Sequence, residues 1–202
     1  MTSSLQCCVE RLGRGERIAI AGLGDSLTAG WMVERGFFDQ FVDILAERYP
    51  GAHLRGMNAG VPGDTAAGGL GRIGHILAGS PDIVTIQFGI NDMYLGIPVT
   101  SFGKSIRAIV GGVQSAGSLA ILTTSCPMRF DGDAMAIAPY YEAIAAVGRD
   151  LGAPVADTAS FWLSNMESWA GLLQADGVHP TFAGHRLMAY GLAGLFRSSE
   201  DG

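Results

Sequence analysis

The chain is poor in charge: only 16% of its 202 residues are Asp, Glu, Lys or Arg, whereas 48% are hydrophobic. This composition excludes an intrinsically disordered chain and predicts a well-buried interior. The sequence has no basic run and a net charge of −6, so we expect no binding to nucleic acid. No apolar run reaches the roughly 18 residues of a transmembrane helix, so no membrane span is predicted.

The N-terminal segment 1–16 lacks the apolar stretch of roughly 7–15 residues that a signal peptide carries. The sequence therefore predicts a cytoplasmic protein. A chain of this length fits one domain, which we expect to span residues 1–202, with residues 1–15 and 197–202 as flexible termini.

Cysteine is scarce, with Cys7, Cys8 and Cys126 alone. The number is odd, two are adjacent and there is no C-x-x-C pair, which argues against a disulfide framework and against a zinc site. Cys126 ends an apolar run, a pattern that favours a small buried hydrophobic residue over a catalytic thiol.

Short β-branched runs alternate along the chain with longer amphipathic stretches. We expect strands over residues 17–23, 53–57, 82–88, 118–125 and 153–156. We expect helices over residues 37–49, 64–78, 102–114, 135–151 and 180–196, the last with Pro180 in its first turn. This alternation predicts a parallel sheet of five strands with helices on both faces. Ligands of such sheets bind beyond the carboxyl ends of the strands.

Residues that can carry acyl-transfer chemistry follow the first three predicted strands. Ser26 lies at a strand-to-helix turn, where its hydroxyl and its own N–H face the same space. Gly63 can present its N–H without a side chain in the way, and Asn91 can donate from its amide to a developing oxyanion. Each residue type is also common as a helix cap or turn former, so no single position decides the matter.

Asp176 and His179 stand three residues apart just before the last predicted helix. This spacing allows the carboxylate to fold back on the imidazole, fix its tautomer and stabilise its protonated form. Together with Ser26, Gly63 and Asn91, they supply a nucleophile, a base, a residue that orients the base, and oxyanion donors.

Four sequence blocks resemble those of the SGNH, or GDSL, hydrolase family of lipases, acylhydrolases and esterases. GDSLT at 24–28 contains Ser26, NAGVPGDT at 58–65 contains Gly63, GIND at 89–92 contains Asn91, and DGVHP at 176–180 contains Asp176 and His179. The blocks occur in the family's order and span most of the chain.

The resemblance implies a three-layer α/β/α sandwich of flavodoxin-like type with a mostly parallel sheet. It also implies hydrolysis of a carboxylic ester or thioester through an acyl-enzyme. Ser26 is then the nucleophile, and His179 and Asp176 are its proton-transfer partners. The N–H groups of Ser26 and Gly63 and the amide of Asn91 form the oxyanion hole, and the chemistry needs no metal or organic cofactor.

Three segments that follow strands are rich in methionine and aromatic residues: 93–101, 127–139 and 159–175. They favour an apolar pocket wall, and hence short-to-medium acyl chains over acetyl. At the position that follows Gly30, many relatives have a small or different residue where this chain has Trp31. The candidate substrate-binding residues are Trp31, Tyr94, Met128, Phe130 and Trp162.

Several other functions remain open at the level of sequence. A carbohydrate acetylesterase or an acyltransferase would use the same site residues, and a binding module on this fold would most naturally have lost one of them. Residues 69–74 match the dinucleotide fingerprint G-x-G-x-x-G. However, no strand immediately precedes that motif, so a nicotinamide oxidoreductase is disfavoured.

Overall fold

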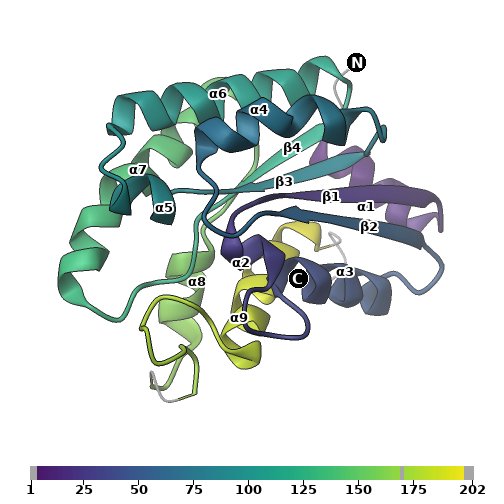
Figure 1. The fold of residues 1–202 in the computed structure, drawn as a ribbon. Coiled ribbons are helices and arrows are strands. Elements are labelled where there is room, and N and C mark those ends of the chain that lie inside the picture. The colour runs from purple at the N-terminus through teal and green to yellow at the C-terminus, as the bar shows by residue number, and fades with distance from the viewer. Residues whose placement is uncertain (1–3, 169–170, 198–202) are drawn as a thin grey trace.

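The computed structural model describes residues 4–168 and 171–197. Within these residues a five-stranded sheet forms the centre of the molecule, in the order β2-β1-β3-β4-β5, and each pair of neighbouring strands is parallel (Figure 1). The strands are β1 (Arg17–Gly24), β2 (His53–Gly60), β3 (Ile83–Gln87), β4 (Leu119–Thr123) and β5 (Val155–Ala156). The predicted parallel sheet is confirmed.

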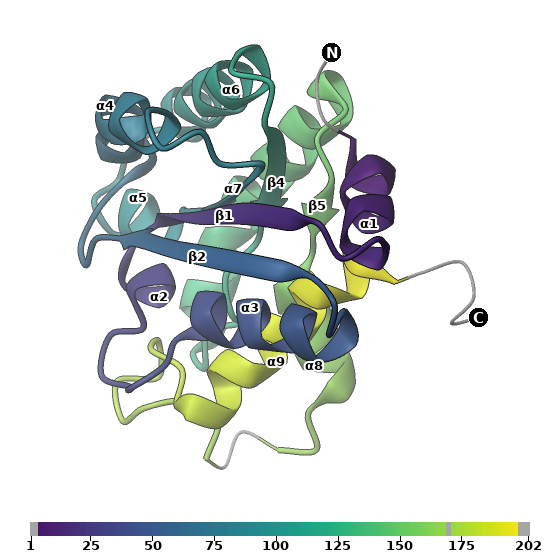
Figure 2. The same ribbon diagram turned by 90° about the vertical axis from the view of Figure 1, so that its right-hand side faces the viewer.

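Helices cover both faces of the sheet, which gives the three-layer sandwich (Figures 1 and 2). On one face lie α4 (Ala66–Leu77), α6 (Val99–Ser115) and α7 (Asp131–Leu151). On the other lie α3 (Phe37–Arg48), α8 (Thr158–Asn165) and α9 (Phe182–Ala193), and η1 (Gly194–Phe196) continues from α9. None of the helices in the described residues is both long and apolar enough to cross a membrane.

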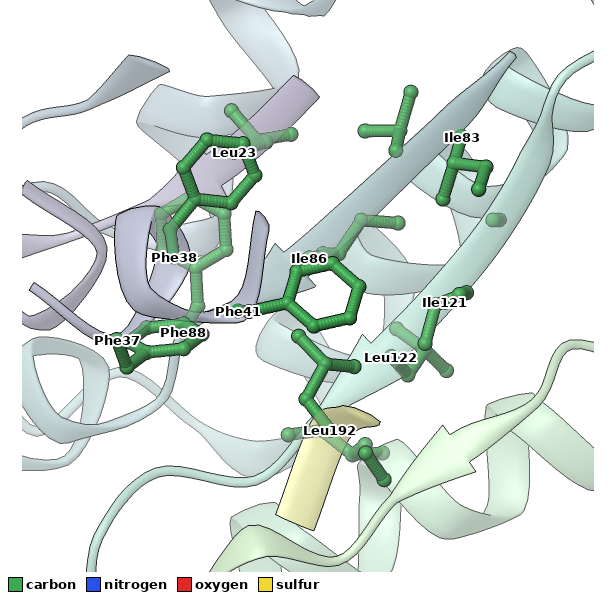
Figure 3. Packing of buried hydrophobic residues seen from close by; sticks show 14 of the residues in the cluster. Leu23, Phe37, Phe38, Phe41, Ile83, Ile86, Phe88, Ile121, Leu122 and Leu192 are labelled. Carbon is green, nitrogen blue, oxygen red and sulfur yellow. The ribbon is translucent and has the colours of Figure 1, made fainter. Parts of the chain in front are cut away.

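The side of the sheet that faces α3 is packed with aromatic rings. Phe37, Phe38 and Phe41 of α3 are buried and gather beside residues of the central strands and of α9 (Figure 3). Gly22 of β1 makes this possible, because a Cβ there would lie 2.5 Å from the ring of Phe38. Every residue of β3 and of β4 is buried, as expected of parallel strands covered on both faces.

Two short helices start where β1 and β3 end: α2 (Ser26–Ala29) follows β1, and α5 (Ile90–Tyr94) follows β3 after two residues. Both lie at the carboxyl-end edge of the sheet (Figure 1). The expected ligand-binding edge therefore carries the residues that the sequence singled out.

The N-terminal segment differs from the expected flexible terminus. Residues Leu5–Gly13 form α1, in which Cys8 and Leu12 are fully or almost fully buried. Ser4 caps this helix by accepting a hydrogen bond from the N–H of Cys7, at 3.2 Å. The helix forms because its apolar residues recur at helical spacing and pack on the core. The tail at 198–202 lies outside the described residues.

The three segments that were expected to form the pocket wall are partly helical. Segment 93–101 contains the end of α5 and the start of α6, and α7 begins at Asp131. Segment 159–175 contains most of α8, which Asp157 caps by accepting from the N–H of Ser160 at 3.0 Å. Pro180 precedes α9, whose N-cap is Thr181, so the expected helix start at Pro180 was also wrong.

Candidate active site

Ser26, His179 and Asp176 form a hydrogen-bonded row. The Oγ atom of Ser26 lies 3.0 Å from Nε2 of His179, and Nδ1 of His179 lies 2.8 Å from Oδ2 of Asp176. The predicted residues are therefore brought together, although 153 positions separate Ser26 from His179. The arrangement lets the imidazole accept the serine proton while the carboxylate holds its other nitrogen.

The local fold of α2 fixes Ser26 at its first position. Asp25 is the N-cap and accepts from the N–H of Leu27 at 2.9 Å, and Gly30 ends the helix in the left-handed conformation. The first N–H groups of a helix have no partner within it. Asp25 takes that of Leu27, and the N–H of Ser26, at the first position of α2, has no partner within the helix.

A tight turn orients His179. Oδ1 of Asp176 accepts from the N–H groups of Val178 and His179, each at 3.0 Å, and Gly177 between them has a φ of 71°. Burial acts to raise the pKa of Asp176, but these hydrogen bonds and His179 outweigh it and hold the pKa below its ordinary value. Asp176 is therefore ionised whenever His179 needs its support.

Cys126 contacts the same turn, because its Sγ donates to the carbonyl of Val178 at 3.2 Å. The thiol is fully buried, and burial raises its pKa far above the ordinary value. The expectation of a buried, unreactive cysteine agrees with this environment.

Gly63 lies in the turn after β2, and Asn91 lies in α5, at the same edge of the sheet. Gly63 has a φ of 80°, which a residue with a side chain rarely adopts. The side-chain amide of Asn91 donates one of its two hydrogens to the carbonyl of Asp64 at 2.8 Å, so the other remains available. Both carboxylate oxygens of Asp92 lie 3.2 Å from the N–H of Ala66, which ties α5 to the start of α4. Burial raises the pKa of Asp92 to about 6.

A buried polar network that the sequence analysis missed lies beneath Ser26. The amide of Gln87 donates to Oδ2 of Asp25 at 3.2 Å and to Oγ of Ser125 at 3.0 Å, and it accepts from Oγ1 of Thr28 at 2.9 Å. Burial, partly offset by the hydrogen bonds from Leu27 and Gln87, raises the pKa of Asp25 to about 7. The signal was present in the sequence, since Gln87 is a polar residue in a strand that is otherwise almost entirely apolar.

The exposed aromatic residues near the site are Trp31, Tyr94 and Phe130, with 53%, 52% and 54% of their surface accessible. The N–H of Trp31 donates to the carbonyl of Ser26 at 3.0 Å. Phe130 lies against Gly177, where an added Cβ would meet its ring at 2.8 Å. Phe130 therefore contacts the turn that precedes His179, and Trp31 is joined to Ser26 through the backbone.

Tyr94 joins the α5 turn to the start of α7. Its hydroxyl donates to Oδ2 of Asp133 at 2.9 Å and lies 3.8 Å from the sulfur of Met128. Burial and the hydrogen bond to Asp133 raise the pKa of Tyr94 to about 12, so it stays a neutral donor.

Two of the candidate substrate-binding residues are buried. Met128 is only 3% exposed and lines a mostly apolar cavity of about 420 Å³ between α7 and α8, whose lining includes none of Ser26, Asp176 and His179. Trp162 is fully buried, and Gly184 of α9 makes room for its ring, because a Cβ there would lie 2.4 Å from Trp162. The proposed role of Trp162 in the substrate pocket was therefore wrong: its large ring fills the core between α8 and α9.

The G-x-G-x-x-G match at 69–74 lies inside α4. A dinucleotide fingerprint would instead occupy the turn between a strand and its helix. Gly69 has a packing role, because a Cβ there would lie 2.4 Å from the ring of Phe88. The motif gives no support to a nicotinamide oxidoreductase.

Comparisons with known proteins identify the family. The model of the GDSL-like lipase/acylhydrolase family matches residues 23–187. Esterase TesA of Pseudomonas aeruginosa is 29% identical over 166 residues, which cover 80% of this chain and 79% of that protein. An arylesterase of Vibrio mimicus is 29% identical over 103 residues, half of each chain.

Solved structures share the fold. A crystal structure of TesA has a TM-score of 0.75 at 24% identity, over 89% of this chain and 98% of that chain. Axe2, an acetylxylan esterase from Geobacillus stearothermophilus, has a TM-score of 0.78 at 21% identity, over 90% and 95% of the two chains. Since the family model covers most of the sequence and includes the blocks around Ser26, Gly63, Asn91 and His179, the chain belongs to the GDSL-like lipase/acylhydrolase family and is an ester hydrolase.

Proposed function

We propose that this chain hydrolyses carboxylic esters or thioesters of short-to-medium acyl groups through an acyl-enzyme on Ser26. The observation that carries the proposal is the row from Ser26 through His179 to Asp176, with hydrogen-bond distances of 3.0 and 2.8 Å. These distances fall within the range over which a base can take the proton of its nucleophile.

In the first half of the reaction, Oγ of Ser26 attacks the carbonyl carbon and its proton passes to Nε2 of His179. The carbonyl oxygen becomes an oxyanion, which accepts hydrogen bonds from the N–H groups of Ser26 and Gly63 and from the amide of Asn91. His179 then gives its proton to the departing alcohol or thiol, and the acyl group remains on Ser26.

In the second half, His179 takes a proton from water, and the resulting hydroxide attacks the acyl carbon. The oxyanion forms again in the same place. His179 returns the proton to Oγ of Ser26 as the carboxylic acid leaves. Asp176 stabilises the imidazolium in both halves and stays ionised throughout.

The exposed apolar side chains of Trp31, Tyr94 and Phe130 favour a substrate whose acyl or alcohol group is apolar. Trp31, Tyr94 and Phe130 are each about half exposed although they are large aromatic residues, and Leu95 and Met135 are more exposed still. Large apolar side chains that stay exposed on a protein surface are typical of a region that contacts a ligand.

A series of p-nitrophenyl esters from acetate to decanoate, together with matched acyl-CoA thioesters, tests the substrate class. We expect kcat/KM to rise by up to about 15-fold for each two carbons until the acyl chain extends beyond the apolar surface, since each fully buried methylene is worth about 0.8 kcal/mol. Ser26→Ala serves as the control for turnover at this site. A rate that peaks at acetate and falls at butyrate would reject the apolar site and favour a carbohydrate acetylesterase.

The same assay separates hydrolysis from acyl transfer. When an alcohol is added, a hydrolase still releases mainly free acid, whereas an acyltransferase forms the new ester as its main product. If no ester or thioester is turned over, the non-catalytic binding module becomes the better account.

A cytoplasmic location, which the sequence predicts, is tested by fractionating cells that produce the full-length chain.

A further inference from the structure

Arg72 lies in α4, within the motif at 69–74 that the ester-hydrolase site leaves unexplained. Its guanidinium makes contacts outside its own helix: Nε donates to Oδ2 of Asp64 at 2.8 Å, Nη2 to the carbonyl of Gly24 at 2.9 Å, and Nη1 to the carbonyl of Ala59. One planar group therefore joins the end of β1, the end of β2 and the turn that follows β2.

Two of these three contacts, with Gly24 and Asp64, lie close in sequence to a proposed oxyanion donor. Gly24 is the last residue of β1, two positions before Ser26. Asp64 directly follows Gly63. The backbone carbonyl of Asp64 accepts the hydrogen bond from Asn91 at 2.8 Å, so a shift of Asp64 moves Asn91 as well. Arg72 is thus connected to all three groups that would stabilise the oxyanion.

We propose that Arg72 is a positioning residue that holds the oxyanion donors of Ser26, Gly63 and Asn91 in one geometry. This proposal rests on the proposed function, because it assigns Arg72 a task in that same reaction. Arg72 does not touch the reacting atoms. It acts through the carbonyl of Gly24 and through Asp64.

The Gly63 turn is held by hydrogen bonds and not by side chains packed around the glycine. The N–H of Val61 donates to the carbonyl of Gly24 at 3.0 Å, the N–H of Asp64 donates to the carbonyl of Val61 at 3.1 Å, and Arg72 adds its ion pair with Asp64. Gly63 has a φ of 80°, and no atom outside its immediate neighbours lies within 4 Å of the place where its Cβ would be. Oxyanion donors are effective only when they are already in place, and a misplacement of about 1 Å can cost about 10²-fold in rate.

The chemistry of the side chain also fits this task. A guanidinium presents its N–H groups in fixed directions within one plane, whereas the ammonium of lysine is a compact charge on a flexible stem.

Gly68 leaves room for the carboxylate that Arg72 holds, because a Cβ there would lie 1.9 Å from Oδ1 of Asp64. An alanine at this position must therefore push the carboxylate aside.

Kinetics of Arg72→Ala and Arg72→Lys with p-nitrophenyl butyrate test the proposal. We expect kcat to fall by about 10²-fold with KM changed by less than about threefold, since the loss concerns the transition state. The inhibition constant of benzeneboronic acid, which forms a tetrahedral adduct with an active serine, should rise in proportion. Guanidinium chloride at low millimolar concentration should restore part of kcat to Arg72→Ala, whereas urea should not.

Two further variants separate positioning from folding. Arg48 is a matched control, because its guanidinium also holds backbone carbonyls, those of Ala193 and Phe196. Arg48→Ala should lower the melting temperature and leave kcat unchanged. Gly68→Ala should keep the melting temperature near that of the wild type, because alanine favours a helix by about 1 kcal/mol over glycine. It should still lower kcat by at least about tenfold.

The outcomes distinguish this proposal from the proposed function. If the wild type neither hydrolyses esters nor binds the boronic acid, the proposed function fails. If the wild type does both, and Arg72→Ala or Arg72→Lys keeps the wild-type kcat, the role of Arg72 is overturned and the function stands. If Arg72→Ala does not fold, Gly68→Ala decides: an unchanged kcat in that variant overturns the role.

Discussion

At the residue scale, replacing Asn91 removes a single hydrogen-bond donor from the proposed oxyanion hole. Removal of a single oxyanion donor typically costs about 10²–10³ in kcat. We therefore predict a loss of about that size for Asn91→Ala, with little change in KM, measured by steady-state kinetics on one ester. Asn165→Ala is the control, because its amide also donates to a carbonyl, that of Phe161 at 2.7 Å, but in α8. A pure rise in KM for Asn91→Ala would move Asn91 to substrate binding.

Asp25 and Gln87 test the buried network beneath Ser26. Asp25→Asn leaves one of two donors, Leu27 N–H or the Gln87 amide, without an acceptor, which costs about 1–3 kcal/mol. Gln87→Glu sets a second buried carboxylate against the first. In the double variant, the amide introduced at position 25 can donate to the carboxylate introduced at position 87. The hydroxyls of Thr28 and Ser125 can also donate to that carboxylate. We predict that urea unfolding finds the double variant at least about 2 kcal/mol more stable than the sum of the single losses. Strict additivity would contradict the network.

The catalytic blocks were predictable from the sequence, because each reactive residue stands next to the turn that presents it. Gln87 could have been singled out as a polar residue in a largely apolar strand, but its partners could not, because its hydrogen bonds join positions 62 and 38 residues apart. The contact of Arg72 with Gly24 was hidden for the same reason, since 48 residues separate them. Trp162 was misassigned because the number of aromatic residues in a segment does not tell which of them face the core.

At the scale of elements, His185 joins α9 to α3. Its Nδ1 accepts from the N–H of Phe37 at 3.1 Å, at the start of a helix whose N-cap, Gly36, offers no side chain. The imidazole is fully buried, and burial lowers its pKa to about 4. A protonated ring could no longer accept this hydrogen bond, so α3 is held to α9 by the neutral form.

The depressed pKa of His185 makes stability depend on pH. The unfolded chain takes up the proton below about pH 6.5, whereas the folded chain resists it down to about pH 4. Stability from this group is therefore complete above pH 6.5 and decreases as the pH falls towards 4, by an amount on the order of 3 kcal/mol. We predict that His185→Asn, which keeps an acceptor near the position of Nδ1, loses less stability than the wild type between pH 7 and pH 4.5.

Urea unfolding at the two pH values measures this difference. His75→Asn is the matched control, because His75 is exposed on α4 and its replacement should leave the pH dependence unchanged. If His185→Asn and the wild type lose the same free energy of unfolding, His185 does not cause the acid sensitivity.

The order of the long elements was predictable from periodicity alone, whereas the short ones were not. Helix α1 could have been found, since Leu5, Cys8, Val9 and Leu12 recur at helical spacing. Helices α2 and α5 have only four and five residues, too few for a period to emerge, and caps and tertiary packing define them.

At the scale of the whole molecule, a parallel sheet explains why residues distant in sequence make one site. Strands β1, β2 and β3 all end at the same edge, and the turns beyond them carry Ser26, Gly63 and Asn91. The turn with Asp176 and His179 reaches the same edge just before α9 (Figure 1). Sequence order alone could not show that Arg72 and Gln87 hold these turns from within.

The central claim is that Ser26 is the nucleophile, and covalent labelling with a fluorophosphonate tests it most directly. We predict that intact mass spectrometry finds one adduct per wild-type chain, that peptide mapping places it on Ser26, and that turnover is lost in parallel. Ser26→Ala should take up no label and lose at least about 10³-fold in turnover with its fold intact, and His179→Ala should label far more slowly. Equal labelling of Ser26→Ala and the wild type would contradict the account.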